Sequence, residues 1–231
     1  MYWFYDYYYI VLVVPMMILA LWAQWNVQHT FKKYSKVLSY RGMTGHDAAR
    51  RILDANGLHN VAIVRVAGDL TDHYDPRSNT VNLSQSVYDS QSVAAIGVAA
   101  HEVGHAVQHA VGYTPIKIRM TIIPVTQFAS TMSMPLVLLG LVLSFPALAL
   151  IGCAFFGMAT VFQLVTLPVE FNASRRAMKT LEETGILSGN ELDGSRSVLS
   201  AAAMTYVAAL AVSLAQLLRL LLIVGGGRGR D

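Results

Sequence analysis

The sequence is poor in charge and in cysteine. Charged residues make up 13% of its 231 residues, whereas soluble domains contain about one quarter. Hydrophobic residues reach 54% and gather in a few long runs, which is the composition of a membrane protein. The single cysteine, Cys153, excludes an intramolecular disulfide and a cysteine-type zinc site. A net charge of only +3 gives no reason to expect a nucleic-acid partner.

Four apolar runs predict about four transmembrane helices in a mainly α-helical membrane protein. The first run, about 8–23, has aromatic residues at both ends, as interfacial belts do. Asp6 is the only charged residue before it, so it does not resemble the basic start of a cleaved signal peptide. The last run, about 200–224, has Arg219 near one end, where an arginine side chain can snorkel to the interface.

The uncharged stretch 122–169 is too long for one span of about 20 residues. Two helices joined at Ser144-Phe145-Pro146 form the simplest hairpin, with Pro124, Pro135 and Pro168 expected to kink or bound them. The expected organisation is an anchor (1–25), a hydrophilic region (26–121), the hairpin (122–169), a second hydrophilic segment (170–199), a C-terminal span (200–224) and a disordered tail (225–231).

Lysine and arginine lie beside the spans on one side only, apart from the tail. Their positions are Lys32, Lys33, Lys36, Arg41, Lys117, Arg119, Arg175, Arg176 and Lys179. By the positive-inside rule, both hydrophilic regions face the cytoplasm from the plasma (inner) membrane. Arg228 and Arg230 would then lie outside, which runs against the rule.

The first hydrophilic region predicts a small α+β domain with a short β-sheet. A capped helix is expected to begin at Thr44 and end at Asn56-Gly57, followed by a strand over 61–66. Turn residues at 75–79 precede an alternating segment, 80–84, that is expected to be a strand at the sheet edge. A helix that starts at Ser90 or Ser92 and continues to about Val111, before Gly112, completes the region.

This last helix contains the sequence His101-Glu-Val-Gly-His105. Residues four apart lie about 40° from each other around a helix, so both imidazoles can face a single zinc ion. Glu102 is rotated away from them and can act as the general base toward a water molecule. Such a trio also occurs by chance on solvated helices. Here the flanking residues 93–100 are apolar, and buried titratable groups require a partner or a metal.

The third ligand must come from elsewhere in the chain. His109 lies about 12 Å along the helix from His101, too far to share its metal, and is expected to lie behind the ligands or line the groove. Gln108 and Val111 exclude the metzincin pattern. Glu170 is the first acidic residue after the motif, and two spans return the chain to the same side of the membrane. The alternative for Glu170 is an ordinary helix N-terminal acid or a partner of Arg175.

The chain resembles the YugP-type bacterial membrane zinc metallopeptidases along nearly its whole length. The resemblance is carried by the stretches 70–76 (LTDHYDP), 81–84 (VNLS), 101–109 (HEVGHAVQH) and 168–177 (PVEFNASRRA). More distantly, the order of motif, hairpin and glutamate is similar to that of HtpX-type gluzincins, which implies a zincin-like catalytic domain. Many gluzincins have an aspartate four residues after the glutamate ligand, where this chain has Ser174, so the resemblance implies a histidine-orienting role for that hydroxyl.

Further residues are candidates for contacts with a peptide or membrane-protein substrate. His73 and Tyr74 could line the cleft, or they could belong to a polar turn. Val81, Asn82 and Leu83 could pair with an extended substrate by strand addition.

Two classes of function remain at this point, together with a less favoured third. The first is a zinc-dependent endopeptidase in the lipid bilayer, and the second is a catalytically silent scaffold or chaperone that zinc stabilises. A scaffold needs the ligands but not the base, so Glu102 favours the enzyme. A zinc transporter would need charged residues in its spans, and the hairpin has none.

Overall fold

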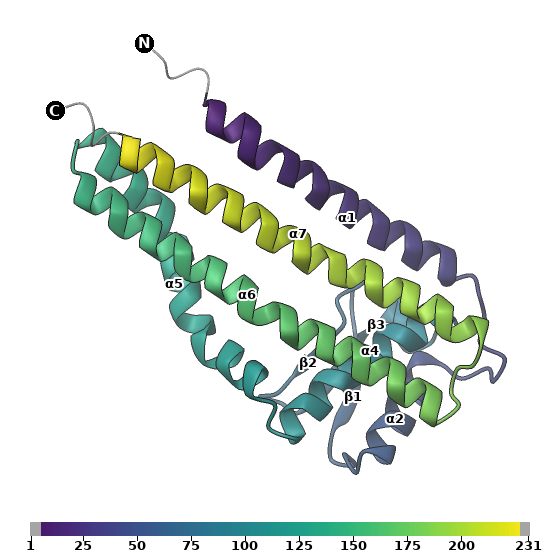
Figure 1. Cartoon of the computed structure of the whole chain (residues 1–231). Helices are drawn as coiled ribbons and strands as arrows, with labels where there is room; N and C mark the ends of the chain where they lie inside the picture. Colours follow the sequence, from purple (N-terminus) through teal and green to yellow (C-terminus); the bar gives the residue numbers. More distant parts are fainter. Residues whose placement is uncertain (1–5, 227–231) are drawn as a thin grey trace. The chain divides into compact units, whose positions relative to one another are not determined.

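The computed structural model describes residues 6–226 (Figure 1). Its helices are a π-helical segment η1 (Tyr9–Val13), α1 (Val14–Tyr34), α2 (Gly45–Ala55), α3 (Gln85–Tyr88), α4 (Val93–Ala110), α5 (Thr114–Val142), α6 (Pro146–Glu183) and α7 (Asn190–Gly226). Its strands are β1 (Ala62–Val66), β2 (His73–Asp75) and β3 (Thr80–Ser84). The predictions for residues 1–5 and 227–231 lie outside the described residues.

The chain divides into two compact units. The apolar unit comprises the residues up to Ala23, Ile118–Leu167 and the residues from Thr205 onward. The polar unit comprises Gln24–Lys117 and Pro168–Met204. The long helices α1, α6 and α7 each continue from one unit into the other.

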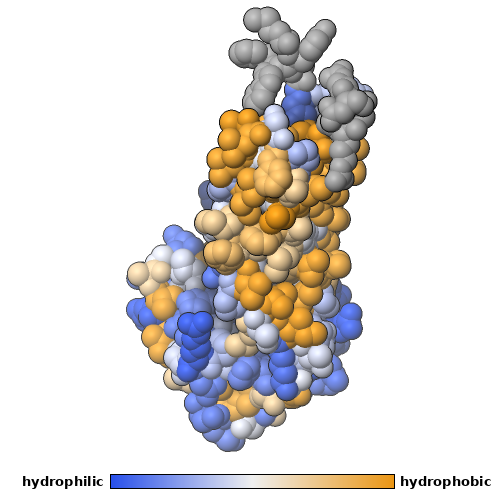
Figure 2. Space-filling model, turned by 90° about the vertical axis from the view of Figure 1, so that its left-hand side faces the viewer, coloured by the Kyte–Doolittle hydropathy of each residue, from blue (hydrophilic) through white to orange (hydrophobic). Residues whose placement is uncertain are grey.

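Within residues 6–226, four helices are long and apolar enough to cross a membrane, which confirms the predicted mainly α-helical membrane architecture. They are Tyr9–Tyr34, Thr114–Val142, Pro146–Glu183 and Asn190–Gly225. Large hydrophobic side chains cover much of their outer surface (Figure 2). The helix of the last span includes Gly225, so the helix extends into the tail that was predicted to be disordered from that residue onward.

Small residues bring the helices of the apolar unit close together. The hairpin turns at Ser144, whose φ of 51° is left-handed, between α5 and α6. A Cβ atom added at Gly140 would lie 2.3 Å from the Ala149 backbone nitrogen, so the two helices touch backbone to backbone there. Thr160 of α6 and Ser213 of α7 share a hydrogen bond of 2.7 Å.

The three prolines that were predicted to kink or bound the hairpin helices lie inside helices and do not end them. Pro124 and Pro135 lie within α5, and Pro168 lies within α6. The prediction that these prolines could mark the ends of the helices is therefore wrong. Spanning helices tolerate proline because neighbouring groups satisfy the backbone carbonyl that it leaves free.

The sheet of the polar unit has the order β1-β3-β2, so β3 is its central strand. β1 pairs with β3 in parallel along all five residues, and β2 pairs with it antiparallel from His73↔Asn82 to Asp75↔Thr80. The prediction of an edge strand over 80–84 is therefore wrong. Val81 and Asn82 cannot accept a substrate strand by strand addition, because β1 and β2 pair with them on both sides. Leu83 pairs with β1 on one side.

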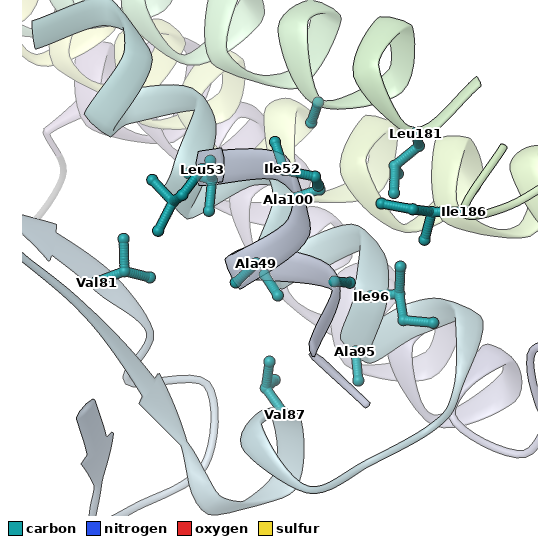
Figure 3. Packing of buried hydrophobic residues seen from close by; sticks show 14 of the residues in the cluster. Ala49, Ile52, Leu53, Val81, Val87, Ala95, Ile96, Ala100, Leu181 and Ile186 are labelled. Atoms are coloured by element: carbon teal, nitrogen blue, oxygen red, sulfur yellow. The ribbon is translucent and has the colours of Figure 1, made fainter. Parts of the chain in front are cut away.

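The hydrophobic core of the polar unit lies around α4. Ile52 and Leu53 of α2, Val81 of β3 and Ile96 of α4 converge there, and Leu181 of α6 closes the cluster (Figure 3). The helix α2 begins with a capping box in which the Thr44 side chain accepts a hydrogen bond from the Asp47 backbone N–H. This core holds α4 rigidly, and α4 carries the histidine motif.

Candidate metal centre

The motif helix α4 has well-defined ends and an apolar body. The Ser92 side chain caps its first turn by accepting a hydrogen bond from the Ala95 N–H at 3.2 Å. Gly112, with φ of 66°, follows its last turn, as the sequence predicts. Because residues 93–100 are almost all buried, the helix presents His101 and His105 at a fixed place on its surface.

Glu170 of α6 meets the two histidines of α4 within the polar unit. Its Oε2 lies 3.3 Å from His101 Nε2 and 3.6 Å from His105 Nε2. One ligand atom from each of the three residues lies within 4.8 Å of the others, so the group could hold a metal ion. Glu170 is only 2% exposed. A carboxylate is rarely so buried unless it is paired or binds a metal ion.

A glycine in the motif makes this approach possible. A Cβ atom added at Gly104 would lie 2.7 Å from the carbonyl oxygen of Ala173 and 3.3 Å from its Cα. The backbones of α4 and α6 therefore touch at this point, one residue from His105 and three from Glu170. The close contact brings together the segments of α4 and α6 that carry the two histidines and the carboxylate.

The Nδ1 nitrogen of each imidazole, which is not the nitrogen that faces Glu170, has a hydrogen-bond partner. His101 Nδ1 lies 3.1 Å from Ser174 Oγ, and His105 Nδ1 lies 3.0 Å from Gln108 Oε1. When Nδ1 donates its hydrogen outward, the neutral ring keeps a lone pair on Nε2, and both Nε2 atoms face Glu170. Two imidazoles and one carboxylate form the donor set of a catalytic zinc site, so these residues fit zinc.

The candidate base, Glu102, lies beside this group and is buried. Its Oε2 accepts a hydrogen bond of 3.1 Å from the backbone N–H of Tyr74 in β2. The strand β2 therefore directs this N–H away from the sheet and toward α4, where it fixes one oxygen of the carboxylate.

Glu170 and His105 have shifted pKa values. Burial disfavours the charged form of Glu170, but hydrogen bonds to His101 and His105 hold its pKa well below the usual value. Burial also lowers the pKa of His105, but the contact with Glu170 and the charge of Glu102 more than offset this and raise it. In the metal-free protein, a proton and a metal ion thus compete for the Nε2 atom of His105.

The remaining predicted residues do not join the metal-ligand group. His109 is exposed, and its ring centroid lies 6.0 Å from that of Tyr74. The Tyr74 hydroxyl donates a hydrogen bond to Asn79, and His73 Nδ1 lies 2.9 Å from the carbonyl oxygen of Thr71. Arg176 donates to Asn172, so its guanidinium is held within α6.

Sequence reasoning missed Gln108 and Asn172. Gln108 is fully buried and contacts both His105 and Asn172. The signal that could have identified it is its position three residues after His105, on the same helix face, in an otherwise apolar helix.

Known protein families and related proteins show which family the chain belongs to. The family model described as "Putative neutral zinc metallopeptidase" matches residues 9–225. The protein named "Putative membrane protease YugP" from Bacillus subtilis (strain 168) is 49% identical over 223 residues, which cover 96% of this chain and 99% of the relative. No solved structure is detectably similar to the chain. The matched region includes both α4 and the Glu170 segment of α6, and on this evidence the chain belongs to the YugP-type family described as "Putative neutral zinc metallopeptidase".

Proposed function

We propose that the protein is a membrane-embedded zinc endopeptidase with His101, His105 and Glu170 as ligands and Glu102 as general base. The observation that carries the proposal is the convergence of the three ligand groups within 4.8 Å, with the Glu102 carboxylate fixed beside them. Zinc bound by these residues would polarise the substrate carbonyl and lower the pKa of an attacking water.

Glu102 carries the proton in this reaction. Its carboxylate takes a proton from the water as the oxygen attacks the carbonyl carbon, and it then delivers that proton to the leaving nitrogen. The C–N bond breaks, and one carboxylic acid and one amine result. The Tyr74 N–H holds one oxygen of Glu102, which leaves the other free to move the proton.

The substrate of this proposal is a polypeptide at the membrane surface. An extended chain can lie beside β2, because β2 is an edge strand of the sheet and its outer side is next to Glu102. Nothing in this arrangement requires a particular side chain at the cleaved bond.

Removal of zinc is expected to abolish peptide hydrolysis by the detergent-purified protein. The test substrates are an unfolded soluble protein and a library of fluorescence-quenched peptides. We expect a loss of about 100-fold or more after chelation and recovery when equimolar zinc is added, because removing the zinc takes away the polarising group. Intact, zinc-loaded protein that cleaves neither substrate would instead support the silent scaffold.

We also propose that the polar unit faces the cytoplasm, since its lysine and arginine residues follow the positive-inside rule. Cysteines at Ala55, in the polar unit, and at Ser144, in the hairpin turn, would test this in a Cys153→Ala background; both positions are exposed. In intact cells, a membrane-impermeant maleimide is expected to label Ser144→Cys and not Ala55→Cys. The reverse pattern would contradict the orientation.

A further inference from the structure

A buried amide links the two helices that carry the proposed ligands. Gln108 of α4 is 0% exposed. Its Nε2 donates to the carbonyl oxygen of Val169 at 2.8 Å and to Asn172 Oδ1 at 3.0 Å, while its Oε1 lies 3.0 Å from His105 Nδ1. Val169 and Asn172 lie on either side of Glu170 in α6. One side chain thus contacts a histidine ligand and the segment that presents the glutamate ligand.

Arg176 fixes which group donates and which accepts in each hydrogen bond of the series that runs from Arg176 through Asn172 and Gln108 to His105. A guanidinium can only donate, and Arg176 Nε lies 2.8 Å from the Asn172 side-chain oxygen. That oxygen must therefore accept, so the Gln108 group facing it is the NH₂. The Val169 carbonyl accepts the second N–H of the same group. The Gln108 oxygen is left to face His105 and can only accept.

This series of hydrogen bonds determines which nitrogen of the His105 ring carries the hydrogen. Since Gln108 Oε1 accepts, Nδ1 must donate, and the neutral ring then has its lone pair on Nε2. Nε2 is the atom that lies 3.6 Å from Glu170. An amide that flipped would place its NH₂ against Nδ1 and its oxygen against two other oxygens, so the arrangement has one favourable orientation.

We propose that Gln108 is a positioning residue of the metal centre, held by Asn172 and Arg176. It fixes the His105 tautomer and ring, and it ties α4 to the backbone around Glu170, so two of the three ligands depend on it. The inference rests on the proposed ligand set. Residues behind metal-bound histidines typically change metal affinity by about 10–100-fold when they are replaced.

Ser195 provides a control that separates the role proposed for Gln108 from a general contribution to helix packing. Ser195 is also 0% exposed, and its hydroxyl donates to the Val93 carbonyl, which joins α7 to the first turn of α4. Ser195→Ala therefore removes a buried contact between helices without touching a proposed ligand. Its zinc affinity is expected to equal that of the wild type.

The experiment measures zinc affinity by competition with a chelator, and the absorption bands of the cobalt-substituted protein, in full-length protein in detergent. Gln108→Met keeps the shape but removes all three bonds, and we expect zinc to bind about 10–100-fold more weakly, with altered cobalt bands. Gln108→Glu keeps an acceptor toward His105, but it replaces the NH₂ group by an oxygen that faces the Val169 and Asn172 oxygens and is repelled by them. Because the link to α6 is lost in this variant too, we expect zinc to bind about 10–100-fold more weakly than in the wild type, as in Gln108→Met.

The metal-free melting temperature reports whether each variant folds. If Gln108→Met does not fold, Asn172→Ala removes an acceptor of Gln108 at a partly exposed position and is expected to weaken zinc binding in the same direction. If the folded Gln108 and Asn172 variants have wild-type zinc affinity and wild-type cobalt bands, the role proposed for Gln108 is wrong, while the proposed metal centre is unaffected. A wild-type protein that binds no zinc would overturn the metal centre as well.

Discussion

Glu102→Gln is expected to lower kcat for peptide hydrolysis by about 10²–10⁴-fold, the range contributed by a general base. The amide has nearly the same shape but cannot take a proton from water. Its side-chain oxygen can still accept the hydrogen bond that the Tyr74 N–H now donates to Glu102, so the local fold is preserved. The variant should therefore still bind zinc with unchanged stoichiometry.

Glu182→Gln makes the same chemical change at an exposed position of α6 and is the control for this experiment. Cleavage of quenched peptides and zinc content are measured for both variants. We expect full activity in Glu182→Gln. A zinc-loaded Glu102→Gln protein with wild-type kcat would show that another group carries the proton.

Gly104→Ala is expected to damage the metal centre although the substitution adds only a methyl group. The new Cβ would lie 2.7 Å from the Ala173 carbonyl oxygen and 3.2 Å from its carbon. These are backbone atoms of α6, which cannot rotate away, so α4 and α6 must separate. We expect a loss of about 1–3 kcal/mol of stability from overpacking. Zinc binding should also weaken by about tenfold or more, as after loss of a supporting contact.

Gly157→Ala is the control, because it makes the same substitution at a position where the added methyl group meets no backbone atom. Its Cβ would meet only Leu217 side-chain atoms, at 3.9 and 4.0 Å. The melting temperature and zinc affinity of this variant should stay close to those of the wild type. Equal zinc affinity in Gly104→Ala and Gly157→Ala would mean that the α4–α6 contact does not set the ligand spacing.

Local patterns made much of this architecture predictable. The helix α4 was predictable because Ser92, the apolar run and Gly112 are all signals within one short segment. The spans were predictable because each is a continuous apolar run. Glu170 became a candidate through chain topology, because two spans bring it back to the side of the motif, and the structure brings it to the two histidines.

Contacts between distant segments were not predictable in the same way. The central position of β3 depends on its pairing with β1 and β2, and five alternating residues do not reveal how many partners a strand has. The role proposed for Gln108 depends on Val169 and Asn172, which lie 61 and 64 residues away. In the sequence alone, Gln108 is one polar residue at the end of an apolar helix, and only packing shows that its amide is buried.

Zinc K-edge X-ray absorption of the purified, zinc-loaded protein tests the ligand set most directly. With one zinc ion per chain, the spectrum should fit two imidazole nitrogens at about 2.0–2.1 Å and oxygen ligands at about 2.0–2.2 Å. In Glu170→Ala the bound zinc should fall sharply, whereas His109→Ala should keep the wild-type spectrum. A third imidazole around the zinc, or full zinc occupancy with an unchanged spectrum in Glu170→Ala, would contradict a site built from His101, His105 and Glu170.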